Sequence, residues 1–197
     1  PELTPYADYN RGIALVRAGR DEDAIRALER VANLPAEGEE ELALRDKANL
    51  TLGYIFLRQN ALEHAEDFLQ QVRLNSPYSN RALLAMGWIA QQQGRSDEAL
   101  APWTELRNRN VTDPAVQESL LAVPSLHREL RALGMAATRY EDAANAWEPL
   151  DESTELECLY LFKSGMLKLV DGQYEDGINL IEIIIDQDAY PNYSSRR

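Results

Sequence analysis

The sequence predicts an all-α fold, built as a stack of four to five helix–turn–helix repeats. Apolar residues recur at helical spacing in pairs of segments, and a glycine or asparagine turn joins the two segments of each pair. The pairs themselves recur, because Gly53 and Gly87 hold the same place in successive pairs and lie 34 residues apart. A helix with one apolar face must bury that face on another helix, so the pairs are expected to stack.

Composition and charge indicate a folded acidic protein. The chain of 197 residues is 45% hydrophobic, an ordinary share for a globular protein. Its 33 Asp and Glu residues outnumber its 20 Lys and Arg residues, which gives a net charge of −13. Such a surface repels nucleic acid and anionic lipid and attracts basic proteins. We therefore expect a protein or peptide partner, with a basic one favoured by charge, and neither nucleic acid nor membrane insertion.

Cysteine usage and the chain ends leave the compartment open. Cys158 is the single cysteine, so no internal disulfide forms, which fits both the cytoplasm and the periplasm. The isoleucine-rich segment 178–185 is interrupted by Asn179 and Glu182 and is far shorter than the roughly 20 residues that a membrane-spanning helix needs. The chain begins at Pro1 rather than Met, so we expect a fragment of a longer protein.

The first predicted repeat covers residues 5–35. Gly12 is the small residue in the middle of its first helix, Gly19 forms the turn, and Ala24 is the small residue of the second helix. Asp21 is expected to cap the second helix, because its carboxylate can accept hydrogen bonds from free N–H groups of the first turn.

The next two repeats follow the same plan at residues 47–77 and 80–112, with Asn60 and Gly94 as turn residues. The acidic segment 35–46 is expected either to connect the first two repeats or to extend the following helix. Small side chains are expected where the helices cross closely. In these two repeats they are Gly53, Ala65, Gly87 and Ala99.

A poorer repeat follows at residues 115–149. Ala122 takes the small-residue place, Gly134 the turn, and Ala137 lies on the second helix. Pro124 is expected to kink or break the first helix, because proline cannot donate the backbone hydrogen bond of a helix interior.

The fifth predicted repeat covers residues 156–191, with Gly165 and Gly177 as its small residues. Its isoleucines keep helical spacing, which favours a helix over a strand. One domain over residues 1–197 is expected.

These residues resemble the tetratricopeptide repeat family, whose period is 34 residues. The resemblance implies a right-handed α–α superhelix in which the first helix of each repeat lines a concave groove for a peptide or partner helix. Residues 76–124 also resemble repeat-rich proteins of Gram-negative bacteria, some of them attached to the cell envelope. This second resemblance favours the envelope or periplasm and leaves the cytoplasm open.

One face of the first helices is predicted to bind the partner. It would form an apolar and aromatic floor with a basic-to-polar edge, although Tyr54 and Trp88 could instead pack between neighbouring hairpins. Among the positions at which chaperone-binding family members clamp a carboxylate, only Arg81 fits, so such a clamp is not expected. The predicted binding residues are Tyr9, Ile13, Arg17, Leu50, Tyr54, Arg58, Arg81, Leu84, Trp88 and Gln92, with Val123, His127 and Met166 at corresponding places of the later repeats.

The sequence gives little support for catalysis. His64 and His127 lie in different repeats without a third partner at ligand spacing, and Cys158 has no adjacent histidine. We expect no catalytic residue, metal or cofactor. The predicted function is a non-catalytic scaffold or adaptor. The alternatives are a self-associating oligomer, with a homodimer formed through the end repeats, and an accessory domain of a larger enzyme.

Overall fold

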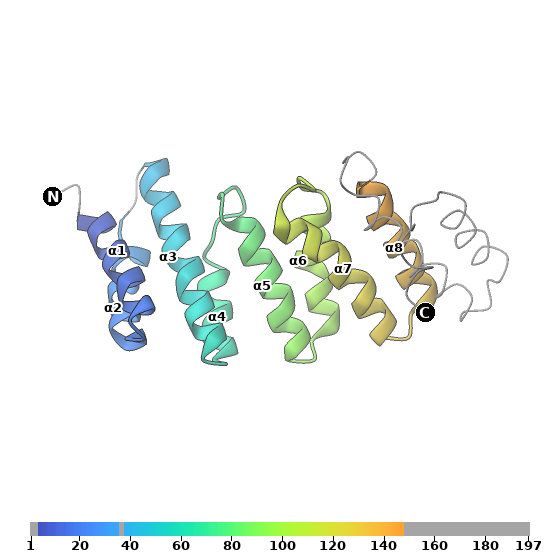
Figure 1. The fold of residues 1–197 in the computed structure, drawn as a ribbon, viewed down its shortest axis with the longest axis horizontal. Helices are drawn as coiled ribbons and strands as arrows, with labels where there is room; N and C mark the ends of the chain where they lie inside the picture. Colours follow the sequence, from blue (N-terminus) through green and yellow to red (C-terminus); the bar gives the residue numbers. More distant parts are fainter. Residues whose placement is uncertain (1–3, 36–37, 148–197) are drawn as a thin grey trace, which may run out of the picture. The chain divides into compact units, whose positions relative to one another are not determined.

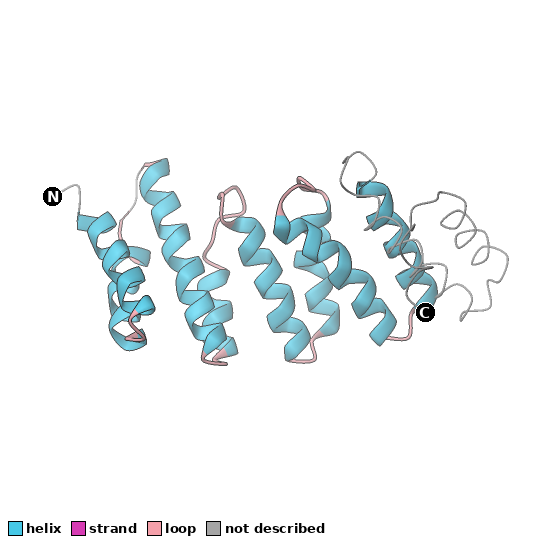
Figure 2. Ribbon diagram, in the orientation of Figure 1, coloured by secondary structure: helices cyan, strands magenta, loops and turns pink. Residues whose placement is uncertain are grey.

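The computed structural model describes residues 4–35 and 38–147, and this part of the chain is made of helices joined by turns and loops (Figures 1 and 2). No strand occurs in these residues, so the predicted all-α repeat fold is confirmed. The helices are α1 (Thr4–Arg17), α2 (Asp21–Ala32), α3 (Glu39–Arg58), α4 (Leu62–Leu69), α5 (Ser79–Gln92), α6 (Ser96–Arg107), α7 (Pro114–Glu129) and α8 (Leu133–Trp147).

The chain divides into two compact units, residues 1–102 and 103–197. In the first unit α1 packs on α2, α2 on α3, α3 on α4 and α4 on α5, which is the serial packing expected of stacked hairpins. In the second unit α7 packs on α8. The fifth predicted repeat, with Gly165, Gly177 and Cys158, lies outside the described residues.

The hairpin turns share one backbone geometry. Each has a residue in the left-handed region, and the N–H of the next residue donates to a carbonyl five residues earlier, as in the Schellman motif. In the first hairpin Gly19 has φ 71°, and Arg20 N–H donates to the Leu15 carbonyl over 2.9 Å. The later left-handed residues are Asn60 (57°), Gly94 (75°) and Arg131 (61°).

Arg131 corrects the predicted register of the fourth repeat. The turn is at Arg131 and not at Gly134, which lies inside α8. Counting from the left-handed residue as in the earlier hairpins, the small-residue places belong to Pro124 and Ala136 rather than Ala122 and Ala137. The sequence concealed this because arginine, unlike glycine, carries no turn signal and is strained at positive φ.

Pro124 does not end its helix. α7 continues to Glu129, and the residues on either side of the proline, Val123 and Leu126 among them, are buried. The missing proline N–H weakens one turn, but burial of the flanking turns holds the helix together. The predicted break is therefore wrong.

The starts of α3 and α2 settle two expectations, and only the one for α2 is wrong. α3 begins at Glu39, so most of the acidic connection extends this helix, and Gly38 N–H donates to the Glu41 carboxylate over 3.5 Å. Asp21 is the first residue of α2 and makes no capping hydrogen bond. Its carboxylate instead accepts from Arg58 on the next hairpin.

The predicted small residues allow close packing inside the first two hairpins. A Cβ atom built on Gly12 would lie 2.7 Å from Leu28 Cγ, and one on Gly53 would lie 2.6 Å from Leu69 Cγ. Both distances are shorter than real Cβ contacts, so only glycine lets these leucines approach. The alanines at the crossings are fully buried: Ala24, Ala65 and Ala99.

Two apolar clusters join the described helices of the first unit. The first cluster joins α1, α2 and α3 around Leu28 and Leu52. The second cluster joins α3, α4 and α5 around Leu69 and Ile89. Since α3 contributes to both clusters, the hairpins of this unit share a continuous core, and the first helices are fixed beside one another.

Candidate functional site

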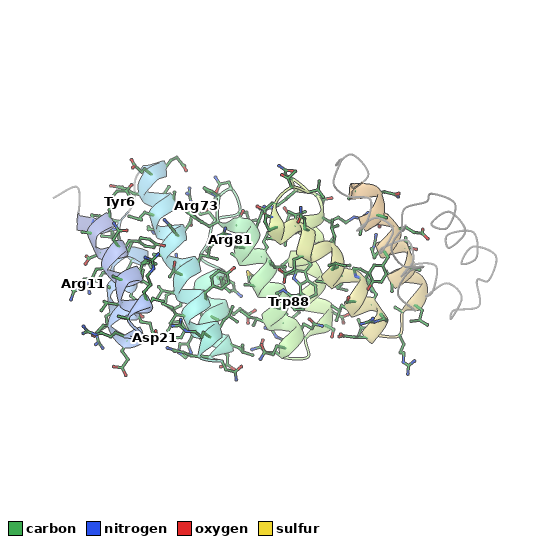
Figure 3. The ribbon with its side chains drawn as sticks, viewed as in Figure 1. Tyr6, Arg11, Asp21, Arg73, Arg81 and Trp88 are labelled. Carbon is green, nitrogen blue, oxygen red and sulfur yellow. The ribbon has the colours of Figure 1, made fainter. Side chains whose placement is uncertain are left out.

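The first unit presents the exposed residues of α1, α3 and α5 that the sequence singles out. We call the set Ile13, Arg17, Tyr54, Arg58, Arg81, Leu84, Trp88 and Gln92 the first-helix face. Its arginines and Gln92 are exposed, and Ile13 and Leu84 are half-buried. Figure 3 shows Arg81 and Trp88 on α5, with Tyr6 and Arg11 on α1.

Two predicted binding residues do not belong to this face. Tyr9 is 7% exposed and packs in the α1–α2–α3 cluster, and Leu50 is 4% exposed and packs in the α3–α4–α5 cluster. Both lie three residues before the crossing glycine, on the side of the helix that meets its neighbours. Tyr9 and Leu50 belong to the core under the first-helix face, and their side chains are too buried to contact a partner.

Tyr54 and Trp88 are the large exposed side chains of the face. Their exposed fractions are 41% and 40%, and each directly follows the crossing glycine of its helix. The Tyr54 hydroxyl also donates to the Arg81 backbone carbonyl over 3.4 Å, which links α3 to α5. Tyr54 therefore contacts the next hairpin and still offers its ring to solvent.

Polar bonds between hairpins fix the lower edge of the face, where α3 and α5 end. The Arg58 guanidinium lies 2.6 Å from Asp21, and Gln92 donates to the Asn60 side chain over 3.1 Å. The hydrogen bond from Arg58, followed by one from Gln59, lowers the pKa of Asp21 below its usual value. Arg58 is thus already paired with a carboxylate.

Sequence reasoning missed Tyr6 and Lys47, which lie six residues before their crossing glycines, as Arg81 does. Tyr6 donates to Glu40 over 2.6 Å, and this hydrogen bond raises the pKa of the Tyr6 phenol. The Lys47 ammonium lies 4.7 Å from the centre of the Tyr9 ring, within cation–π range. The spacing from the glycine was the signal that could have found both residues.

Arg17 and Arg81 differ from Arg58 in their partners. Neither forms an ion pair with another residue of the described part of the chain, and both are exposed. α5 contains no acidic residue at all, and the one acid of α1, Asp8, pairs with Arg30 over 2.9 Å. Arg17 and Arg81 are therefore exposed cations without an ion-pair partner among the described residues, although α3 begins with the acids Glu39, Glu40 and Glu41.

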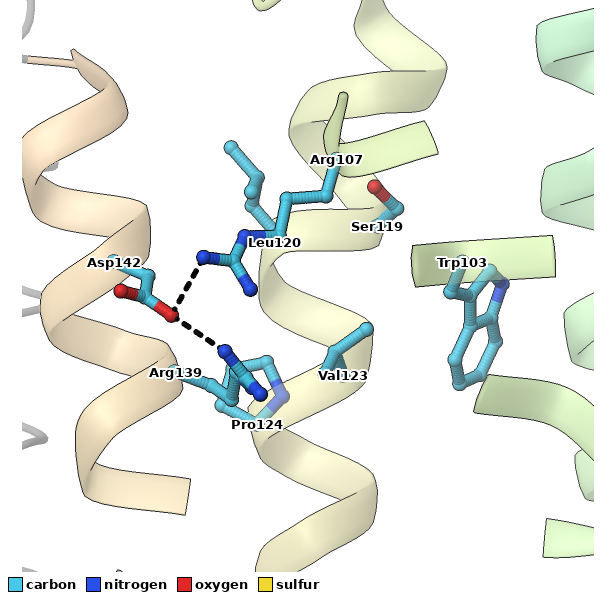
Figure 4. Close-up of a pocket in the computed structure, with 8 residues that line it drawn as sticks. All are labelled: Trp103, Arg107, Ser119, Leu120, Val123, Pro124, Arg139 and Asp142. Carbon is cyan, nitrogen blue, oxygen red and sulfur yellow. Dashed lines mark hydrogen bonds and ion pairs between the residues drawn. The ribbon is translucent and has the colours of Figure 1, made fainter. Parts of the chain in front are cut away.

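The second unit has a small recess between α6, α7 and α8 (Figure 4). Arg107 and Arg139 both pair with Asp142, at 3.0 and 2.8 Å, above an apolar floor that includes Leu120 and Pro124. The cavity volume is about 10 Å³, no more than one water molecule needs. The recess is too small for a substrate, and the arginines tie the helices together.

The histidines show no catalytic arrangement. His64 is exposed and stacks on Phe56 with ring centres 5.3 Å apart. His127 is buried, and desolvation, followed by the charge of Arg139, lowers its pKa. The described residues contain no group of three or more His, Cys, Asp or Glu that could hold a metal. None of the described helices has the length and apolar character needed to cross a membrane.

His127 and Val123 are buried, so they cannot offer the side chains that were predicted to correspond to the face in the fourth repeat. The corrected register explains this result. Counted from Arg131, the corresponding places belong to Ser125 and Glu129.

Comparison with known proteins supports the repeat assignment. Residues 6–34, which span most of α1 and α2, match the family model described as tetratricopeptide repeat. A comparison with curated protein sequences gives no match.

Solved structures of similar fold cover most of the chain. MamA AMB-1 has a TM-score of 0.63 and 14% identity, over 98% of this chain and 97% of that one. The nearly identical tetratricopeptide-like repeats of a putative kinesin light chain of Podosopora anserina give 0.62 and 14%, over 100% and 98%. BtubC from P. vanneervenii gives 0.64 and 15%, over 89% and 76%.

Identities of this size show a common fold and carry no function across. Together with the family match they support the all-α repeat fold that the sequence predicts. The α1–α2 hairpin therefore matches the tetratricopeptide repeat model, and the chain has the all-α fold of tetratricopeptide-like repeat proteins.

Proposed function

We propose that this protein is a non-catalytic scaffold or adaptor that holds a protein or an extended peptide against its first-helix face. Tetratricopeptide repeats generally mediate protein–protein interactions, and stacked repeats present extended binding surfaces. The observation that carries the proposal is the pair of exposed rings on successive first helices, Tyr54 and Trp88.

Large aromatic side chains bury much area while losing little conformational entropy, which is why they dominate many binding surfaces. Tyr54 is also held in place by its bond to the Arg81 carbonyl, so little ordering is left for the moment of binding. The polar rim needed around such an apolar centre is supplied by Arg58, Gln92 and Arg81.

Panning the 197-residue chain against a displayed library of random dodecapeptides tests the proposal. We expect enrichment of a peptide pool by the wild-type chain and its loss with the double variant Tyr54→Ala, Trp88→Ala. Leu74→Ala, which truncates another exposed apolar side chain outside the face, is the matched control and should keep the pool. Circular dichroism should show equal helical content for all three chains.

If the double variant Tyr54→Ala, Trp88→Ala still enriches the same peptide pool as the wild type, binding at this face is refuted. Light scattering on the same samples addresses self-association. A dimer that forms in proportion to protein concentration and excludes the peptides would favour the oligomer instead. A basic partner and an envelope or periplasmic location stay predictions.

A further inference from the structure

The apolar residues of the first-helix face form a single row across successive helices. Tyr54 on α3 and Trp88 on α5 directly follow their crossing glycines, and the half-buried Ile13 holds the same place on α1. We call these three residues the apolar row. The Tyr54 hydroxyl reaches the Arg81 carbonyl of α5 over 3.4 Å, so α3 and α5 are direct neighbours. Neighbouring packed helices have axes about 8–10 Å apart, which sets the spacing along the row.

We propose that the segment bound along the apolar row is a proline-rich stretch in the polyproline II conformation, with an apolar residue at every third position. This inference rests on the proposed function and names the conformation and chemistry of the partner. A polyproline II helix rises about 3.1 Å per residue and turns once in three residues, so the same side recurs about every 9 Å. A β-strand repeats its side every second residue, or about every 7 Å, and residues three apart point to opposite sides.

The width of the row also favours a thin segment. One turn after each row residue, about 6 Å along the helix, the side chains are polar: Arg17, Arg58 and Gln92. We call these three residues the donor edge. A partner α-helix is about 10–12 Å across and needs a broad apolar stripe, so part of that stripe would lie on the donor edge. A polyproline II segment can instead contact one ring per helix.

The donor edge complements a backbone that lacks N–H groups. A guanidinium carries five N–H groups and no acceptor. Arg58 gives one of its nitrogens to Asp21, and the exposed Arg17 forms no ion pair with another described residue. Proline has no backbone N–H, and the carbonyls of a polyproline II segment make no internal hydrogen bond. The edge therefore supplies donors to a segment that offers acceptors.

Charge favours an uncharged segment on the row. The net charge of −13 opposes an acidic segment at long range, and Arg58 is already paired with Asp21. Arg17 in turn opposes a basic residue on the row itself. The glutamates at positions 39–41 of α3 do not change this, because they lie about 20 Å along the helix from Tyr54, beyond the screening length of about 8 Å. Basic residues of a partner are expected outside the proline stretch.

Isothermal titration calorimetry with two decapeptides tests the spacing. The probe is Pro-Ser-Ala repeated three times and closed by Pro, acetylated and amidated at its ends so that it carries no charge. Its isomer has the same composition with a proline at every second position. We expect the 197-residue chain to bind the probe about 10-fold more tightly than the isomer, because only the probe meets both rings. Equal affinities, or no binding of the probe, would overturn the inference.

Variants and salt identify what holds the probe. Tyr54→Ala and Trp88→Ala should each weaken it about 10-fold, whereas Trp88→Phe keeps a ring and Leu74→Ala truncates an exposed side chain outside the face, so both should bind nearly as the wild type does. Between about 50 and about 500 mM NaCl the affinity should change less than about 2-fold, because the probe is uncharged. Undiminished binding by Trp88→Ala, or a steep loss with salt, would contradict recognition by the rings.

The dodecapeptide library separates this inference from the proposed function. A pool without regularly spaced proline that is lost with Tyr54→Ala, Trp88→Ala would overturn the inference and leave the proposed function standing. A selected peptide that becomes helical on binding would overturn it in favour of a partner helix. A pool indifferent to the double variant, or no enriched peptide, would contradict the proposed function itself.

Discussion

Replacing Gly53 by alanine should destabilise the α3–α4 hairpin, even though alanine is the better helix former. The new Cβ would lie 2.6 Å from Cγ and 2.7 Å from Cδ2 of Leu69, and 3.4 Å from the Ala65 carbonyl oxygen. Leu69 is 1% exposed, so its side chain has no free space into which to move. Reaching ordinary contact requires a shift of about 0.8 Å inside a packed cluster.

The magnitude follows from two opposing effects. Alanine gains about 1 kcal/mol over glycine in a helix interior. Overpacking a filled core costs about 1–3 kcal/mol, and a clash with a branched carbon rather than a flexible chain end belongs to the upper part of this range. We therefore expect a net loss of about 1–2 kcal/mol, or a fall in Tm of about 2–8 °C for a chain of this size.

Urea unfolding followed by circular dichroism measures the effect, and Leu69→Ala supplies the decisive background. Leu69→Ala alone should cost about 2–5 kcal/mol. In that background Gly53→Ala should become neutral or stabilising, because the clash is gone and the helix propensity remains. The same destabilisation in both backgrounds, or a higher Tm for Gly53→Ala alone, would refute the close-packing argument.

Two further predictions concern the turn and the edge of the face. Arg131→Gly should stabilise the α7–α8 hairpin by up to about 1 kcal/mol, because arginine is strained at φ 61° and glycine is not. Glycine loses more conformational freedom on folding, which limits this gain. A lower Tm for Arg131→Gly than for the wild type would contradict the prediction. The bond to Arg58 lowers the pKa of Asp21 in the folded state. In acid the unfolded state therefore binds more protons than the folded state does. The stability gained from this bond is present near neutral pH and is lost as the pH falls below about 4. Asp21→Asn should therefore lose less urea stability between pH 7 and pH 3 than the wild type, and an equal loss would show that the bond does not stabilise the fold.

The repeat architecture could be predicted because its signals are local. A glycine or asparagine at a left-handed turn and a small residue seven positions earlier mark the hairpins at Gly19, Asn60 and Gly94. The fourth hairpin uses the same backbone turn at Arg131, where the residue type gives no sign of it. The register was lost there because strain at positive φ is offset by packing elsewhere, which a local pattern does not contain.

The binding face could be predicted only in part. Leu50 and Tyr54 are both on α3 and four residues apart, yet one is 4% and the other 41% exposed. The difference depends on α5, which covers Leu50 through the second cluster but meets Tyr54 through the hydrogen bond from its hydroxyl to the Arg81 carbonyl. Likewise, the bond between Asp21 and Arg58 joins residues 37 positions apart, so capping rules applied to α2 alone assigned Asp21 the wrong role.

Nitrogen–proton correlation spectra of the indole groups test the central claim most directly. The leading library peptide is titrated into the full chain, and the indole signals are assigned by Trp88→Phe and Trp103→Phe. Trp88 is exposed on the first-helix face and Trp103 is fully buried in the second unit. We expect the Trp88 signal to shift in step with binding while the Trp103 signal stays in place; saturable binding that leaves the Trp88 signal unmoved would contradict recognition at this face.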